Sequence, residues 1–253
     1  MDGVKSLIEE VDCVHICTPN QTHFSLATLA LNEGKDVLIE KPMTLNRDDA
    51  FRIAQIANEQ DLIVQCGHIF RFSEAIRITS ELIDPREIRY ITFNWSHYIE
   101  PISGADVLFD LLPHPIDIMH FWTGDWPIEI NGAGISVRRQ DQIEFASINF
   151  LYPTNISVNI LLSWLNRRKI REIDIITDDY SLLIDPVRQT ISKTYSNGSN
   201  QKIPFRSNNS IREEILHFLD CIKSGKNDLN SALIGIRNVE IIQETQKKIY
   251  RYT

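Results

Sequence analysis

Two short motifs in this chain place groups that can exchange protons next to one another. In the first, Glu40, Lys41 and Pro42 directly follow the apolar run 37–39. A continuous apolar run is typical of a strand covered on both faces, and charges at its carboxyl end can line a ligand site. The pair Glu40–Lys41 therefore indicates a site at a strand end. The alternative is an ordinary solvated loop.

The second motif contains Asp110 and His114, which are four residues apart. This spacing puts both side chains on one face of a helix. A carboxylate beside an imidazole fixes the ring tautomer and raises its basicity, as a general base acting near pH 7 requires. Because proline is tolerated only in the first helical turn, Pro113 and Pro115 predict a helix that begins between Asp110 and His114. The alternative is a structural Asp–His pair.

The N-terminal quarter predicts the elements that position the first motif. Strands are expected over 11–19, 36–42 and 62–68, with helices over 22–34 and 46–60 between them. Alternating strands and helices of this length imply right-handed crossovers and a parallel sheet. All three strands then end at one edge, with the polar segments 18–23, 40–42 and 67–72 together there.

The rest of the chain predicts a second architecture. Strands are expected over 88–98, 128–138, 143–152, 156–165, 170–177 and 181–185, with no long helix between them. This run predicts a mostly antiparallel sheet in a second domain. Helices are expected over 210–225 and from Ala232 to about Tyr250. The predicted fold class is α/β: a parallel sheet followed by an α+β domain with an open sheet.

Composition excludes several classes of function. The 253 residues are 43% hydrophobic and 24% charged, which is typical of a globular protein. The net charge of -8 disfavours nucleic acid and anionic membranes as partners, because phosphates would be repelled. The charge-free stretch 145–166 alternates apolar and polar residues, as a half-buried strand does, so we do not expect it to span a membrane.

The four cysteines do not predict a disulfide scaffold or a metal site. Cys13, Cys17, Cys66 and Cys221 form no CxxC pair. We expect buried structural thiols rather than metal ligands, and a reducing cytoplasm as the compartment.

Five segments together resemble the glucose–fructose oxidoreductase/inositol dehydrogenase (Gfo/Idh/MocA) family. In order they are VDCVHICTPNQTH, GKDVLIEKPMTL, GHIFRF, FDLLPHPIDIMHFWTG and REEILHFLDCIKSGK, and they extend over nearly the whole chain. The resemblance implies an oxidoreductase that uses NAD or NADP. It also implies an N-terminal Rossmann domain and a C-terminal α/β domain whose open sheet carries the substrate site.

The resemblance also implies roles for individual residues. Lys41 matches the catalytic lysine of the family and Pro42 its commonly cis proline, while Asp110 and His114 match its catalytic Asp and His. His114 is then expected to take the substrate hydroxyl proton, Lys41 to polarise that oxygen, and Asp110 to orient His114. Leu112 stands where many members have glycine. The positions that match the cofactor-flanking residues are Thr18, Pro19, Asn20, His23, Glu40 and Lys41.

One expected element is missing from the sequence. No G-x-G-x-x-G occurs, so the resemblance implies that strand 11–19 corresponds to the fourth Rossmann strand. We expect a truncated chain that binds NAD(H) weakly, with a remnant NAD(P)-binding domain at 1–67 and a substrate-binding and oligomerisation domain at 68–253. The expected substrate is a small sugar-like alcohol of nucleotide-sugar or inositol type, and the expected assembly is a homodimer or homotetramer. The alternative is a non-catalytic sugar-binding or assembly protein.

Overall fold

The computed structural model describes residues 2–101, 104–227 and 229–252. The chain divides into two compact units, Met1–His68 with Ile211–Gln243, and Ile69–Ser210 with Glu244–Thr253. The division at residues 67 and 68 that the sequence suggests stays a prediction. The structure adds that residues 211–243 pack with the first unit.

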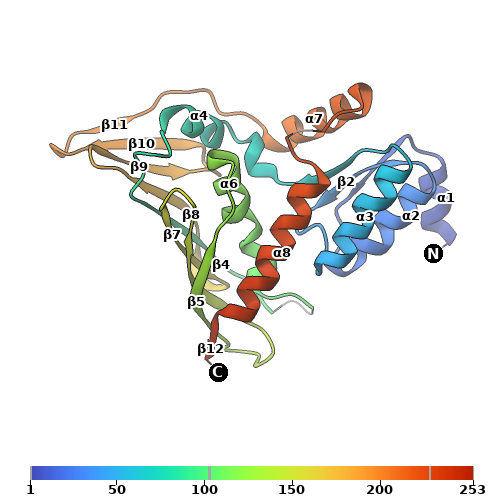
Figure 1. Ribbon diagram of the computed structural model, residues 1–253, viewed down its shortest axis with the longest axis horizontal. Helices are drawn as coiled ribbons and strands as arrows, with labels where there is room; N and C mark the ends of the chain where they lie inside the picture. The colour runs from blue at the N-terminus through green and yellow to red at the C-terminus, as the bar shows by residue number, and fades with distance from the viewer. Residues whose placement is uncertain (1, 102–103, 228, 253) are drawn as a thin grey trace. The chain divides into compact units, whose positions relative to one another are not determined.

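The first unit is built on a small parallel sheet (Figure 1). Its strands lie in the order β1-β2-β3 and all pairs are parallel, as predicted. The elements in chain order are α1 (Asp2–Glu9), β1 (Cys13–Ile16), η1 (Asn20–Thr22), α2 (His23–Asn32), β2 (Asp36–Glu40), α3 (Arg47–Glu59), β3 (Val64–Gly67) and α7 (Ser210–Ser224), followed by most of α8 (Ala232–Lys248).

Strand β2 is the centre of this unit. Val37, Leu38 and Ile39 are each fully buried, which confirms that both faces of the strand are covered. The helix boundaries also follow their predicted signals. The Asn46 side chain accepts a hydrogen bond from the Asp49 N–H at the start of α3. Gly34, just past the end of α2, has a φ of 70°, the left-handed conformation that glycine adopts without strain.

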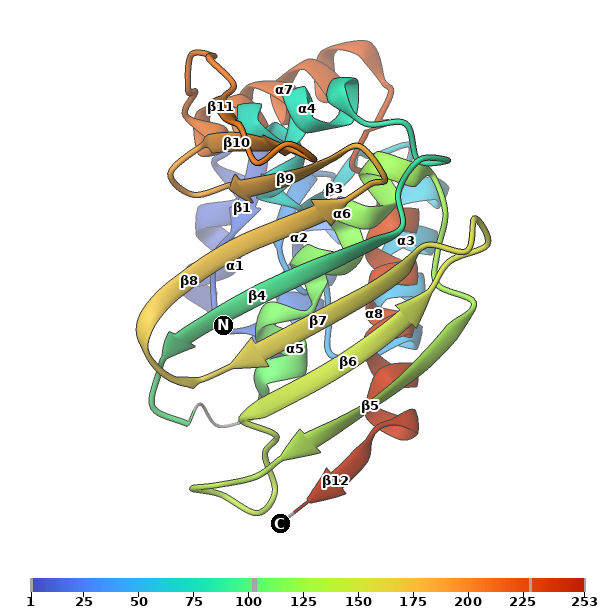
Figure 2. The ribbon, with the colours of Figure 1, turned by 90° about the vertical axis from the view of Figure 1, so that its left-hand side faces the viewer.

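The second unit is built on a broad mixed sheet (Figure 2). Its strand order is β11-β10-β9-β8-β4-β7-β6-β5-β12. Most pairs are antiparallel, as predicted, while β4–β7 and β5–β12 are parallel. The elements are η2 (Ile69–Phe72), α4 (Glu74–Leu82), β4 (Tyr90–Tyr98), α5 (Val107–Leu111), α6 (Pro113–Thr123), β5 (Glu129–Ile135), β6 (Phe145–Leu151), β7 (Ser157–Ser163), β8 (Leu165–Ile176), β9 (Tyr180–Asp185), β10 (Thr190–Tyr195), β11 (Asn200–Lys202) and β12 (Tyr250–Tyr252).

The charge-free stretch 145–166 forms β6 and β7 and the start of β8. In and beside β7, the side chains of Ile156, Val158, Ile160, Leu162 and Trp164 are fully buried, as the alternation predicts. Among the described residues, no helix has the length and apolarity needed to cross a membrane.

One predicted helix end was wrong, and three short strands were not predicted. The last helix ends at Lys248 rather than near Tyr250, because residues 250–252 turn into β12 and pair with β5. Strands β10, β11 and β12 were not predicted. Two of them are only three residues long and β10 is largely polar, so none has an apolar run that signals a strand.

Candidate active site

The first motif lies where the sequence placed it, directly after β2. Glu40 is the last residue of the strand, and Lys41 follows it. Both side chains are partly buried, which fits a site at the sheet edge better than a fully solvated loop. The Lys41–Pro42 peptide bond is cis, as the family resemblance implies.

His23 joins the ends of the first two strands. Its Nδ1 lies 2.9 Å from the carbonyl oxygen of Pro42, and its Nε2 lies 2.9 Å from the carbonyl oxygen of Thr18. The ring is fully buried. His23 therefore has a structural role here: it holds the backbone of Thr18 and Pro42. The side chains of Thr18 and Pro19 are exposed, and that of Asn20 is partly exposed.

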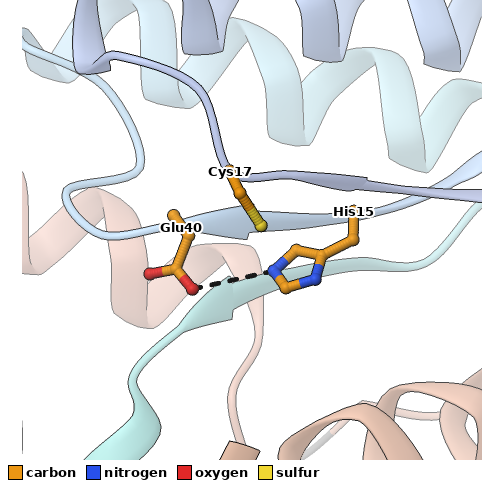
Figure 3. A group of neighbouring side chains, drawn as sticks. All are labelled: His15, Cys17 and Glu40. Carbon is orange, nitrogen blue, oxygen red and sulfur yellow. Dashed lines mark ion pairs between the residues drawn. The ribbon is translucent and has the colours of Figure 1, made fainter.

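Three side chains cluster on one face of β1 and β2 (Figure 3). Nε2 of His15 lies 3.7 Å from a carboxylate oxygen of Glu40, and Cys17 lies beside them. Burial favours the neutral form of Glu40, but the facing His15 and the charge of Lys41 outweigh it and lower the pKa of this carboxyl. Gly67 pairs with Glu40 across β2–β3, and a Cβ at Gly67 would lie 3.1 Å from the Glu40 carboxylate.

The expectation of buried thiols is wrong for two cysteines. Cys66 and Cys221 are buried, as predicted, but Cys13 is only partly buried and Cys17 is exposed, because Cys13 lies in the edge strand β1 and Cys17 lies just past its end. Burial and the carboxylates of Glu40 and Glu214 raise the pKa of the Cys17 thiol. The donor atoms of His15, Cys17 and Glu40 lie within 4.8 Å of one another, so these side chains could hold a divalent metal such as zinc.

Helix α6 begins at Pro113, between Asp110 and His114 as predicted, and a short helix α5 that was not predicted precedes it. The side chain of Asp106 caps α5 by accepting hydrogen bonds from the N–H groups of Leu108 and Phe109. Leu112 then keeps a right-handed helical conformation between α5 and α6. Pro113 and Pro115 fall in the first turn of α6, where proline is tolerated. The helical spacing of Asp110 and His114 is therefore kept across the junction.

Asp110 is held by Trp164, which lies between β7 and β8, and is faced by His97 of β4. The indole N–H of Trp164 donates to Oδ2 of Asp110 at 2.9 Å, and Nε2 of His97 lies 3.9 Å from the same oxygen. Arg171 approaches the other ring nitrogen of His97, with a distance of 2.9 Å between Nη2 and Nδ1. A guanidinium can only donate, so Nδ1 accepts and the ring proton is on Nε2, facing Asp110.

Arg171 is itself fixed in this position. One of its terminal nitrogens donates to the carbonyl oxygens of Ser96 and Ile170, and its guanidinium lies 5.6 Å from the centre of the Trp95 ring. Burial lowers the pKa of Arg171 to about 10, against the opposing effect of the negative charge of Asp110. The side chain is still positively charged at neutral pH.

His114 lies among aromatic rings. Phe70 meets its ring edge to face with 4.8 Å between centroids, and the ring of the fully buried Trp95 is 6.3 Å away. These rings fix the position of the imidazole beside the helical turn that carries Asp110. Asp110, His114, His97 and Arg171 all belong to the second unit, whereas Lys41 belongs to the first.

Sequence reasoning missed His97, Trp164 and Arg171. The sequence did contain a signal for His97. It lies two residues after Trp95 in the strand expected over 88–98, and this spacing puts both rings on one face of the strand. Trp164 was recognised only as an apolar member of its strand. The contact between Arg171 and His97 depends on the pairing of β8 with β4, and the sequence does not specify that pairing.

Comparison with known proteins gives consistent matches along the chain. Residues 1–68 match a family described as "Oxidoreductase family, NAD-binding Rossmann fold", and residues 73–182 match "GFO/IDH/MocA C-terminal domain". UDP-N-acetylglucosamine 3-dehydrogenase of Acidithiobacillus ferrooxidans is 29% identical over 198 residues, which are 75% of this chain and 60% of that protein. The chain thus spans less than two thirds of this relative's length.

Solved structures agree in fold. The structure of the same Acidithiobacillus ferrooxidans dehydrogenase has a TM-score of 0.88 at 26% identity, with 97% of this chain and 81% of that chain covered. An inositol dehydrogenase homologue of Azotobacter vinelandii, complexed with NADH and myo-inositol, has a TM-score of 0.83 with 96% of this chain and 79% of that chain covered. At 16% identity, that second likeness shows the fold alone.

Proposed function

Because the chain belongs to the Gfo/Idh/MocA family of oxidoreductases, we propose that it carries the substrate-activating groups of an NAD(P)-dependent dehydrogenase for a sugar-like alcohol. We favour a nucleotide sugar over an inositol as the substrate. The relative that is 29% identical is named as a dehydrogenase of a nucleotide sugar, UDP-N-acetylglucosamine. The observation that carries the proposal is the fixed carboxylate of Asp110 on the helical segment that presents His114.

In this proposal, His114 is the general base. Its neutral imidazole accepts the proton of the substrate hydroxyl, and the nearby carboxylate of Asp110 stabilises the imidazolium that results. Trp164 and His97 hold Asp110 on the side of the sheet, so that its orientation does not depend on the substrate. Lys41 holds the substrate oxygen and stabilises the negative charge that develops there.

The exposed strand ends of the first unit fit one part of a dinucleotide. The hydroxyl of Thr18, the amide of Asn20 and the carboxylate of Glu40 are polar groups at the carboxyl ends of parallel strands, where α/β sheets bind ligands. When bound, NAD or NADP supplies the acceptor for the hydride that leaves the substrate carbon. The glycine-rich turn that usually holds the pyrophosphate is not found in this sequence.

A direct test is an activity assay on protein expressed with any in-frame coding sequence upstream of Met1. Reduction of NAD and NADP is followed by absorbance with UDP-N-acetylglucosamine, UDP-glucose and myo-inositol as substrates. We expect turnover with a nucleotide sugar, and Lys41→Met and His114→Asn should each lower kcat by at least about a hundredfold while cofactor affinity changes little.

Two outcomes would contradict the proposal. If both variants keep wild-type turnover, Lys41 and His114 do not act on the substrate. If protein that binds the cofactor oxidises none of these alcohols but binds them, the non-catalytic sugar-binding alternative is favoured instead.

A further inference from the structure

The start of β8 is strongly basic in a chain of net charge -8. Four of the five residues from 167 to 171 are Arg or Lys. Arg167 lies over the ring of Tyr98, 3.7 Å from its centroid, and Arg171 contacts His97. Among the described residues, the side chains of Arg168 and Lys169 form no ion pair or side-chain hydrogen bond. Two cations in this segment are thus available to a ligand.

These cations line a cavity in the second unit. Its volume is about 440 Å³, within the range typical of small-molecule sites. The lining residues are Arg168, Lys169, Ile170, Arg171, Glu172, Asp185, Val187 and Arg188. Four of these side chains are positive and two are negative, so the lining has a formal charge of +2. The cavity therefore favours an anion, in contrast to the chain as a whole.

The cavity exists because β8 is longer than the strand beside it. On one edge of β8, β9 pairs only with Ile173–Ile176. On the other edge of β8, β4 pairs as far as Leu165. In the described part of the chain, residues 165–172 have no strand partner on the β9 side. The turn after β9 brings Arg188 to this open edge, where it pairs with Asp185 at 3.7 Å.

The cavity adjoins the group that we place in the active site. Arg171 forms part of its lining, the guanidinium of Arg171 lies 2.9 Å from His97, and His97 faces Asp110 at 3.9 Å. Two side-chain contacts thus connect the basic cavity to the carboxylate beside His114. All of these residues lie in the second unit, so the connection depends only on contacts within that unit.

We propose that this cavity binds the phosphate or diphosphate group of the substrate while the sugar ring lies at Asp110 and His114. The inference rests on the proposed function and narrows its substrate class to phosphate-bearing sugars. Arginine forms paired hydrogen bonds with phosphate oxygens, and lysine adds a mobile point charge. An uncharged inositol would gain no binding free energy from these cations, because it has no phosphate.

A simpler explanation is that Arg168 and Lys169 protect an open strand edge from pairing with other chains. That role needs positive charge but no defined binding site. The two explanations differ in whether a phosphate binds saturably at these residues.

The test is calorimetric titration of the 253-residue chain with pyrophosphate and with UDP, without cofactor. The variant Arg168→Glu/Lys169→Glu is compared with Lys202→Glu/Arg206→Glu, which changes the net charge equally at two exposed residues outside the cavity lining. We expect the first variant to bind both ligands at least about tenfold more weakly, a change of about 1.4 kcal/mol, because it loses charged hydrogen bonds to phosphate. The control variant should bind within about twofold of the wild type.

Competition identifies the source of the phosphate. A UDP-sugar should displace pyrophosphate, whereas glucuronate and myo-inositol should not. The proposal is overturned if neither pyrophosphate nor UDP binds saturably, or if both double variants weaken binding equally. Because the titration needs no turnover, loss of phosphate binding and failure of the dehydrogenase assay are separate results.

Discussion

At the scale of single residues, the proposed base depends on a chain of partners rather than on one pair. Asp110 is fixed by Trp164 and faced by His97, and His97 is in turn fixed by Arg171. Because Arg171 can only donate, it assigns the ring proton of His97 to the nitrogen beside Asp110. Partners of this kind keep a catalytic carboxylate in one orientation, as outer-shell partners do at metal sites.

Replacing His97 tests this positioning role. We expect His97→Leu to lower kcat by roughly tenfold to a hundredfold while KM changes less, since outer-shell partners typically contribute that much. His97→Gln can still donate to Asp110 and should recover part of the loss. The pH–rate profile supplies the check: His97→Leu should move the apparent pKa of the catalytic base, and an unchanged profile would mean that His97 is only structural.

Glu40 gives a prediction about stability and pH. Its folded-state pKa lies below the usual value of 4.5, because His15 and Lys41 favour the charged form more strongly than burial disfavours it. A lowered carboxyl pKa stabilises the fold above the unfolded-state pKa, and this contribution is lost as pH falls through the folded-state pKa.

We therefore expect wild type to be more stable than Glu40→Gln at pH 7, and the difference to shrink below about pH 4.5. Urea unfolding at several pH values measures this difference in the free energy of unfolding. Glu81→Gln serves as the control, because Glu81 is an exposed carboxylate on α4. A stability difference that does not depend on pH would show that the charge of Glu40 is unimportant.

At the scale of secondary structure, the short helix α5 depends on its cap. α5 has five residues, too few for a stable isolated helix, and the Asp106 side chain satisfies two of its free N–H groups. The other carboxylate oxygen of Asp106 accepts a hydrogen bond of 3.0 Å from Gln246 in α8. This cap therefore fixes the turn that carries Asp110.

Asp106→Ala should destabilise the protein by about 1–2 kcal/mol, the usual effect of losing a cap, and should lower kcat as Asp110 becomes less well ordered. Asp106→Asn retains a capping oxygen and should have a much smaller effect on both. Denaturant unfolding and steady-state kinetics measure the two effects. If the alanine and asparagine variants are equally stable, the capping bonds do not hold α5.

At the scale of the whole molecule, the sequence predicts patterns well and long-range contacts poorly. The parallel order of β1, β2 and β3 follows from alternating strands and helices, and the face of β7 follows from its period of two. The basic cavity could not be predicted, because it depends on how far β9 extends along β8. Helix α5 before Asp110 was not predicted because its signal is a capping Asp106, whereas α6 begins at Pro113 as the prolines indicated.

The broad sheet leads to the last prediction, which concerns assembly. Helices α5 and α6 lie behind the sheet in Figure 2. Along β4, β6, β7 and β8, polar residues alternate with buried apolar ones and so point to the opposite face, where Asn159 is bonded to Asn149 and Thr92 to Asp174. Leu183 on the same face is 44% exposed. Symmetric pairing of two copies through this face would cover these groups, so we expect a homodimer or a larger closed assembly.

Asp174 makes this expectation sensitive to pH. Burial raises the pKa of Asp174 despite the bond from Thr92, and a partner copy on this face would raise the pKa further. Association should then weaken as pH rises from about 4 to 7, because the charged form resists burial.

Asp174→Asn removes that charge and should strengthen association at pH 7, whereas Asp220→Asn, at an exposed residue of α7, should not. Light scattering at micromolar concentration measures both effects. A folded monomer for wild type and Asp174→Asn alike would show that this face is solvated.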